Sequence, residues 1–115
     1  MANCETITLC PDLEIADAPL LSEPLEVGPF REGRLFVKLR NVDERASVSV
    51  DIGISPTGYE DWDRHWSVLE TANGLGEATM YSYPISNFGN WLRLRIRSSN
   101  GTETDCRIQA WFVGK

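Results

Sequence analysis

The sequence predicts an all-β protein: an antiparallel, two-sheet β-sandwich of jelly-roll type with seven or eight strands. Apolar and polar residues alternate in short runs separated by turn residues, and no stretch longer than about ten residues has the periodicity of a helix. The runs recur about every 8 to 12 residues, a spacing typical of sandwiches and barrels. The cysteine and tryptophan spacing of immunoglobulin domains is absent, so we favour the jelly roll.

The composition indicates one folded domain over residues 1–115. The chain has 42% hydrophobic and 24% charged residues, which is typical of a globular protein and unlike a disordered one. A domain of this length buries roughly two thirds of the surface that its unfolded chain exposes. A hydrophobic core is therefore expected to form without help from a metal or a disulfide.

The charge and the N-terminus restrict the partners. A net charge of −6 and a pI near 4.7 argue against nucleic acid and anionic membranes, because the field of the protein repels phosphate groups. The sequence begins without the basic start and apolar run of a secretory signal, and it has no apolar run of about 18 residues, the length that spans a membrane. We expect a protein made in the cytoplasm that binds neither nucleic acid nor membrane.

The first 30 residues are predicted to form a strand and an irregular edge. The strand covers residues 5–9 and ends before Pro11, because proline lacks the backbone N–H that a sheet needs. The Pro-rich segment of residues 11–30 is expected to be irregular, with one short strand over residues 25–27. Such interruptions keep an edge strand from pairing with other chains.

Two strands with clear alternation follow, over residues 34–42 and 46–54. In the first, Leu35, Val37 and Leu39 are expected to face the core. Its other face carries basic residues around one aromatic ring: Arg34, Phe36, Lys38 and Arg40. In the second, four aliphatic residues are expected to point inward: Val48, Val50, Ile52 and Ile54. The residues between them, Asp51 included, are expected to point outward.

Four further strands are predicted over residues 66–71, 78–83, 91–97 and 106–113, with glycine- and asparagine-rich turns between most of them. Trp66 begins the first of these strands, and we expect it to pack inside the sandwich because a tryptophan buries a large apolar surface. The strand of residues 78–83 is expected to end at Pro84.

An arginine stripe is the main candidate site. In residues 91–97, Arg93, Arg95 and Arg97 alternate with three aliphatic residues, so the arginines share one face. Like charges about 6.5 to 7 Å apart repel each other unless acidic groups, an aromatic ring or a partner contacts them. In the last strand, Arg107 and Trp111 also lie opposite the apolar set, and we expect them to join this face.

Three interpretations of this face stay open. The arginines can stack on Trp111 and pair with acidic residues of the same molecule. The face can instead form a subunit interface, because tryptophan and arginine dominate interface energetics. That predicted interface comprises Trp91, Arg93, Arg95, Arg97, Arg107 and Trp111. The third interpretation is a carbohydrate platform of aromatic rings, and stacking of single-stranded nucleic acid is disfavoured by the acidic total.

The loop of residues 55–65 is the second candidate site. Its members are Tyr59, Asp61, Trp62, Asp63 and His65. Their spacing matches neither a calcium loop nor a zinc site, so we expect no metal and no cofactor. We expect either a solvated acidic loop or a contact surface for a partner, with Asp61 and Asp63 as a possible acidic counterpart of the arginine stripe.

No catalytic motif is visible. His65 is the only histidine, and neither a Gly-x-Ser-x-Gly elbow nor a phosphate-binding glycine loop is present. We therefore expect no catalytic residues and no enzymatic activity. A small hydrolase built on Asp61, Asp63 and His65 is the weakest of the functions considered.

The three cysteines give no metal or redox motif. Cys4, Cys10 and Cys106 are odd in number and contain no Cys-x-x-Cys pair. We expect buried, reduced thiols. A bridge from Cys106 to Cys10 or to Cys4 is the alternative if the protein reaches an oxidising environment.

Two sequence runs carry a resemblance to known families. Residues 50–62 read Val-Asp-Ile-Gly-Ile-Ser-Pro-Thr-Gly-Tyr-Glu-Asp-Trp, and residues 89–96 read Gly-Asn-Trp-Leu-Arg-Leu-Arg-Ile. This pattern resembles small β-sandwich proteins of tailed-phage virions and, more weakly, discoidin-like binding domains. In the families that it resembles, the strand is followed by a turn with the sequence Ser-Pro-Asp-Gly and then by a tryptophan. In this chain Thr57 replaces the aspartate of that turn, and three residues separate Gly58 from Trp62 instead of two.

The phage resemblance implies a non-catalytic assembly protein. Such proteins form symmetric oligomers that decorate a capsid or belong to a tail or fibre, so the implied partners are copies of the chain and capsid or tail proteins. The implied location is the virion, after synthesis in the host cytoplasm. The alternative is a carbohydrate-binding module that uses Tyr59, Trp62 and Trp91 as sugar platforms.

Overall fold

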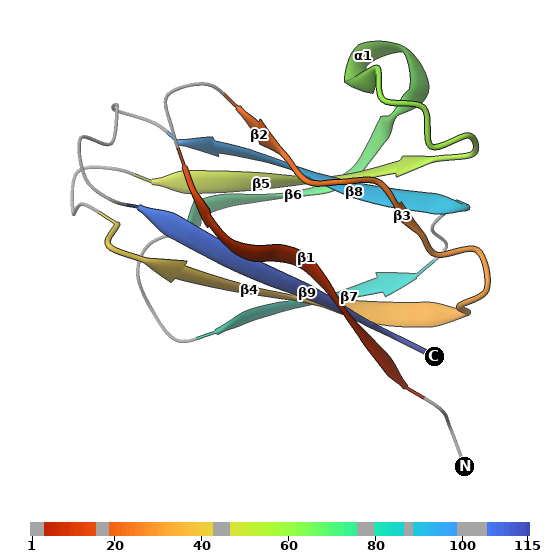
Figure 1. Ribbon diagram of the computed structural model, residues 1–115, viewed down its shortest axis with the longest axis horizontal. Helices are drawn as coiled ribbons and strands as arrows, with labels where there is room; N and C mark the ends of the chain where they lie inside the picture. Colours follow the sequence, from red (N-terminus) through yellow and green to blue (C-terminus); the bar gives the residue numbers. More distant parts are fainter. Residues whose placement is uncertain (1–3, 16–18, 43–46, 76–79, 87–88, 99–105) are drawn as a thin grey trace.

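The computed structural model describes residues 4–15, 19–42, 47–75, 80–86, 89–98 and 106–115, and two antiparallel sheets face each other in it (Figure 1). These residues form nine strands and one four-residue helix. The elements are β1 (Glu5–Glu14), β2 (Leu20–Leu21), β3 (Leu25–Glu26), β4 (Glu32–Arg40), β5 (Val48–Ser55), α1 (Trp62–His65), β6 (Ser67–Leu75), β7 (Tyr81–Ser86), β8 (Trp91–Ser98) and β9 (Arg107–Gly114). The predicted antiparallel sandwich is confirmed.

The strand order is that of a jelly roll. Sheet A has the order β1-β9-β4-β7, and sheet B has the order β2-β8-β5-β6 with β3 also paired to β8. Leu20 pairs with Ile96 and Leu25 pairs with Leu92, so β2 and β3 cover successive parts of β8 as one broken edge strand. Counted in this way, the fold has eight strands in two four-stranded sheets, as in double-sheet jelly rolls.

The core lies between the sheets and follows the predicted alternation. Leu35, Val37 and Leu39 of β4 are buried, as are Val48 and Val50 of β5. The inner faces of β8 and β9 complete the core with Leu92, Leu94, Ile96, Ile108, Ala110 and Phe112. Each large side chain buried in this way contributes about 1.5 to 3 kcal/mol. The starts of two predicted strands, residues 46 and 78, lie outside the described residues.

Two glycines make room for the largest core side chain at one end of sheet A. Gly33 and Gly114 lie opposite each other in β4 and β9. A Cβ atom on Gly33 would lie 2.3 Å from the ring of Phe112, and one on Gly114 would lie 2.6 Å from the same ring. Phe30 packs edge-on against Phe112, with 5.5 Å between ring centroids. Glycine is therefore required at both positions.

Two prolines lie within strands that were expected to end at them. β1 continues through Pro11 to Glu14, with register shifts between Thr8 and Cys10 and between Cys10 and Leu13. β7 likewise continues through Pro84. Both strands are edges of sheet A, where a residue without an N–H is tolerated because one side of the strand has no sheet partner.

All four edges of the described sheets are interrupted. β1 and β7 contain prolines, and the edge formed by β2 and β3 consists of two-residue pieces. β6 has two register shifts against β5, so Leu69 has no partner in the ladder. Prolines, short strands and bulges are the devices that prevent edge-to-edge pairing. Edge-to-edge pairing with another chain is therefore disfavoured at these edges.

Candidate functional site

The arginine stripe lies on the outer face of sheet B, where Asp51 neutralises part of it. Asp51 lies opposite Arg95 in the register of β5 and β8, and its side chain is 2% exposed. Arg95 Nε donates to Asp51 Oδ2 at 2.9 Å, and Arg97 Nη2 donates to Asp51 Oδ1 at 2.9 Å. Thr71 Oγ1 of β6 donates to Asp51 Oδ1 at 2.9 Å. Asp51 points outward as expected, but it is buried.

The surroundings of Asp51 keep it ionised. Burial by itself raises the pKa of this carboxyl group, because a charge loses contact with water. Hydrogen bonds from Arg97, Thr71 and Arg95 outweigh burial, and the pKa of Asp51 lies below its usual value. Asp51 and the two arginines therefore form a charged network within the sheet at neutral pH.

Arg93 is used differently from its two neighbours. It is 8% exposed, and its Nε donates to the Ser22 backbone carbonyl at 2.6 Å. Its Nη1 donates to the Glu60 backbone carbonyl at 2.7 Å. Ser22 lies between β2 and β3, and Glu60 lies in the loop before α1. Arg93 thus ties two distant segments to β8 through carbonyl oxygens.

Trp62 and Trp66, which we call the tryptophan lid, cover two of the arginines. Arg95 lies over the Trp62 ring at 5.0 Å, and Arg93 lies over the Trp66 ring at 5.9 Å. The two rings stack with 5.9 Å between centroids and 8° between planes. Trp66 is half-buried on the outer face of sheet B, so its expected place inside the sandwich was wrong.

A strand glycine and a tight turn let the lid approach the sheet. A Cβ atom on Gly53 would lie 2.4 Å from the Trp62 ring, so only glycine fits beneath it. Ser55 Oγ accepts hydrogen bonds from the backbone N–H groups of Thr57 and Gly58 at 3.2 and 3.1 Å, which turns the chain back after β5. Gly58 has a φ of 74°, and a Cβ there would lie 2.4 Å from the Trp91 ring.

The structure divides the predicted interface between two faces. Trp91, Arg93, Arg95 and Arg97 belong to β8 in sheet B, whereas Arg107 and Trp111 belong to β9 in sheet A. Their expected common face was wrong, because β8 and β9 follow each other in the chain but lie in opposite sheets. The predicted interface that is divided in this way comprises Trp91, Arg93, Arg95, Arg97, Arg107 and Trp111.

Arg107 has its own acidic partner. Arg107 Nε donates to Asp12 Oδ1 at 3.0 Å, and Arg40 Nη2 pairs with Asp12 Oδ2 at 2.7 Å. The hydrogen bonds from Arg40 and Arg107 lower the pKa of Asp12. Trp111 lies between Thr8 of β1 and Phe36 of β4 in the register. The expected stacking of arginines takes place on Trp62 and Trp66, not on Trp111.

The acidic loop does not contact the arginine stripe through its carboxylates. Asp61 pairs with Arg64 at 3.4 Å, with both side chains well exposed, and Asp63 is exposed in α1. His65 packs edge-on against Tyr59 at 5.0 Å. Within the described part of the chain, no three His, Cys, Asp or Glu residues are grouped closely enough to hold a metal ion. Asp51, not Asp61 or Asp63, is the counterpart of Arg95 and Arg97.

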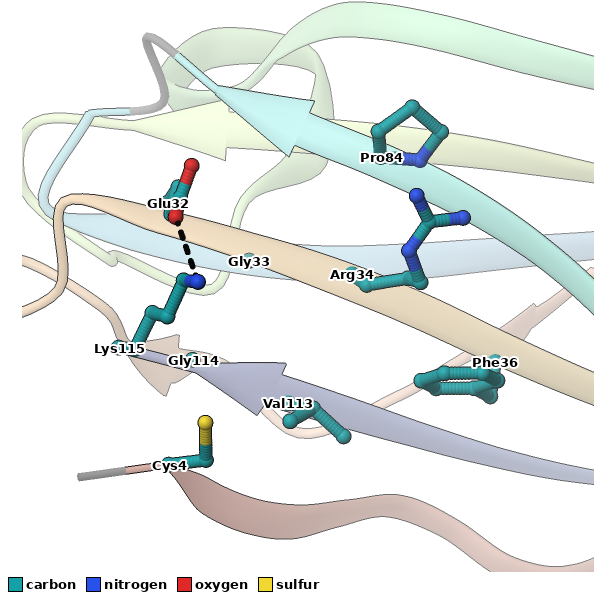
Figure 2. A pocket seen from close by; sticks show the side chains of 9 residues that line it. All are labelled: Cys4, Glu32, Gly33, Arg34, Phe36, Pro84, Val113, Gly114 and Lys115. Atoms are coloured by element: carbon teal, nitrogen blue, oxygen red, sulfur yellow. Dashed lines mark ion pairs between the residues drawn. The ribbon is translucent and has the colours of Figure 1, made fainter. Parts of the chain in front are cut away.

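The outer face of sheet A contains a cavity of about 400 Å³ that sequence reasoning missed (Figure 2). It is lined by Cys4, Glu32, Gly33, Arg34, Phe36, Pro84, Val113, Gly114 and Lys115. Lys115 Nζ and Glu32 Oε1 form an ion pair at 3.1 Å beside it. The signal that could have revealed it was Phe36 among basic residues on the outward side of residues 34–40.

The structure shows no disulfide at Cys4, Cys10 or Cys106. Cys10 pairs with Ala110 of β9, and Cys106 directly precedes this strand. Cys106 and Ala110 are four residues apart along extended chain, which corresponds to about 13 Å. Cys4 lies at the opposite end of β9, because its neighbour Glu5 pairs with Gly114. Neither predicted bridge is therefore possible in this fold. Burial raises the pKa of the Cys10 thiol to about 11.

Comparison with known proteins identifies the fold alone. No family model and no curated protein matches the sequence. A structure of the Bacillus endospore appendages, described as a novel family of disulfide-linked pili, has a TM-score of 0.58 at 9% identity and covers 96% of this chain and 85% of its own. The SPBc2 prophage-derived protein YomS has a TM-score of 0.55 at 16% identity and covers 97% and 94%.

Within the described residues, no helix is long and apolar enough to cross a membrane.

Proposed function

We propose that the protein is a non-catalytic structural subunit that associates with copies of itself and with a larger particle. The proposed setting is a phage virion, as a capsid decoration protein or as part of a tail or fibre. The supporting observation is a jelly roll similar over nearly its full length to a prophage-derived protein and to a pilus-family structure. Viral capsid domains are among the known uses of double-sheet jelly rolls, which supports the proposal by analogy of fold.

The distribution of charge supports an interface on sheet A instead of sheet B. The arginines of β8 are engaged within the molecule by Asp51, by two backbone carbonyls and by the tryptophan lid. On sheet A, Trp111 and Phe36 lie side by side in the register and are half-buried. Aromatic and arginine side chains are enriched at protein interfaces. Of the predicted interface residues, Arg107 is paired with Asp12, so Trp111 remains the candidate for intermolecular contact on this face.

A structural role also fits the chemistry of the perturbed groups. Asp51 is a charged partner of two arginines, and the high pKa of Cys10 lowers the fraction of the reactive thiolate. His65 packs against a tyrosine ring. These groups are engaged in the fold, which supports the absence of catalysis.

Light scattering of the full chain tests the proposed self-association. We expect a mass above that of the 12.9 kDa monomer at micromolar concentration, with the oligomer dissociating on dilution. Native mass spectrometry would then give the number of subunits. A protein that stays monomeric up to millimolar concentration and binds no purified virion or tail particle would contradict the proposal.

A carbohydrate-binding module is the alternative, and an exposed tyrosine favours it. Tyr59 is 62% exposed in the loop before α1, whereas Trp62 and Trp66 contact each other and the arginines. We expect a glycan that stacks on Tyr59 to quench tryptophan fluorescence, and Tyr59→Ala to remove the effect. A glycan array without any binding would remove this alternative.

A further inference from the structure

We propose that the outer face of sheet A binds the loop of residues 55–65 of a second copy of this chain. The contact is head-to-tail: each subunit offers the sheet A face to one neighbour and the loop to another. This inference rests on the proposed self-association and names the two surfaces that carry it. The occupant is a tyrosine with flanking carboxylates, presented by a loop of the same protein.

The binding face combines basic side chains with apolar and aromatic ones. Phe36 and Trp111 are neighbours across β4 and β9, and Arg34 lies opposite Val113. Arg34 Nη1 donates to the neutral Ser82 hydroxyl at 3.1 Å. Among the described residues, no carboxylate pairs with Arg34 or with the exposed Lys38. Within the described part of the chain, a protein with a net charge of −6 therefore presents two cations without a carboxylate partner on one aromatic face.

The cavity on this face has the size and lining for an aromatic side chain. Its volume is about 400 Å³, and Phe36, Val113 and Pro84 give it apolar walls, with Arg34 lying among them (Figure 2). Concave apolar sites with a few polar groups are the usual form of a binding pocket. The ring of a tyrosine would fill the cavity, and the carboxylate of the residue after it would reach the guanidinium group of Arg34.

The loop supplies that chemistry. Among the described residues, Tyr59 is the most exposed of the large hydrophobic side chains, at 62%, and the side chain of the next residue, Glu60, is exposed. Asp61 and Asp63 follow, and Arg64 neutralises Asp61. Glu60 and Asp63 are thus free to pair with Arg34 and Lys38 of the second copy. Complementary charge of this kind guides encounter and fixes orientation.

The loop is held ready for binding by Trp66 and Arg93. Trp66 Nε1 donates to the backbone carbonyl of Tyr59 at 2.6 Å. The nearly buried Arg93 donates to the backbone carbonyl of Glu60 at 2.7 Å. Tyr59 and Glu60 are therefore fixed through their backbone carbonyls, while their side chains are exposed to solvent. A preorganised loop loses less conformational entropy on binding.

The two surfaces cannot meet within one molecule. α1 and its loop project beyond sheet B on the side away from sheet A (Figure 1). A contact between two different surfaces of identical subunits is heterologous, so it repeats along a fibre or closes into a ring. The interrupted edges of both sheets leave this face-to-loop contact as the favoured route of association.

Charge reversal on each surface tests the contact. The face variant carries Arg34→Glu and Lys38→Glu, and the loop variant carries Glu60→Lys and Asp63→Lys. The matched control carries Glu23→Lys and Glu26→Lys, two exposed acids outside both surfaces with the same change in charge as the loop variant. We expect the face and loop variants to associate roughly 10-fold to 100-fold more weakly than wild type, and the control to associate as wild type. Circular dichroism and thermal unfolding confirm that each variant is folded.

Mixing the two variants is the decisive step. The intact loop of the face variant fits the intact face of the loop variant, and the reversed face and reversed loop again carry opposite charges. An equimolar mixture should therefore regain association with one-to-one stoichiometry by light scattering and native mass spectrometry. If wild type associates and the mixture stays monomeric, or if only the face variant is impaired, the head-to-tail contact is wrong while self-association stands. If wild type itself is monomeric at every concentration, the proposed function fails together with the contact.

Discussion

Asp51 and Arg95 lie opposite each other in β5 and β8, and their side chains meet at 2.9 Å beneath the Trp62 ring. The carboxylate also binds Arg97, so one buried acid holds two of the three arginines of the stripe. The arginine stripe of this acidic protein is therefore largely neutralised by contacts within sheet B. The partner surface that we propose therefore lies on sheet A.

Removing the charge of Asp51 should destabilise the protein. In Asp51→Asn, Arg95 and Arg97 lose their anion, and we expect the free energy of unfolding to fall by about 2 kcal/mol. Urea denaturation measures the difference. Asp63→Asn is the matched control, because this acid is exposed, and its effect should stay within about 0.5 kcal/mol. Equal effects for the two variants would show that Asp51 does not support the sheet.

Acid should weaken the fold through the same carboxylate. The pKa of Asp51 is lower in the folded protein than its usual value, so its contribution is complete above the unfolded value of about 3.9. That contribution is lost as the pH falls through the folded-state pKa, because the unfolded chain binds the proton first. Urea titrations between pH 7 and pH 2 should therefore show a shallower loss of stability in Asp51→Asn than in wild type. Parallel curves would contradict this assignment.

Gly53→Ala should displace the tryptophan lid. The added methyl group would lie 2.4 Å from the Trp62 ring, and we expect a loss of about 1 to 3 kcal/mol with a red-shifted tryptophan fluorescence. In a Trp62→Ala background the same substitution should cost much less, because the clash is gone. A double-mutant cycle by urea denaturation isolates this coupling. Additive effects would mean that the ring does not lie on Gly53.

Thiol labelling should distinguish one cysteine from the other two. Cys4 is exposed, whereas Cys10 and Cys106 are buried and the pKa of Cys10 is raised to about 11. We expect Cys4 to react rapidly with a thiol reagent in the native protein and the other two to react only after unfolding. Rapid native labelling of Cys10 would contradict its place in the core. Cys4→Ser serves as the control, because it should remove the fast phase alone.

The alternation of residues predicted which side of each strand is buried, but it could not predict which sheet the strand joins. The inner faces of β8 and β9 were both predicted correctly. The outer residues of the two strands were grouped wrongly, because a period of two contains no information on pairing. Arg107 and Trp111 therefore lie on the opposite side of the sandwich from Arg95.

The burial of Asp51 depends on contacts distant in sequence. Alternation places Asp51 outward, and it is buried there because Arg95, Arg97 and Thr71 contact its carboxylate while Trp62 lies over Arg95. One local signal was present: Gly53 interrupts an otherwise strong strand, and a glycine inside a strand often marks a close approach. The cavity on sheet A requires four strands to come together, so no single run of residues could reveal it.

The most direct measurement compares Lys38→Glu with Arg97→Glu by light scattering and thermal unfolding. We expect Lys38→Glu to unfold at the wild-type temperature and to associate about tenfold more weakly. We expect Arg97→Glu to unfold roughly 10 °C lower, because a second carboxylate would face Asp51, while association of the folded protein is retained. The opposite pattern, with Arg97→Glu stable but monomeric and Lys38→Glu still associated, would place the subunit contact on sheet B and contradict the division of roles between the two faces.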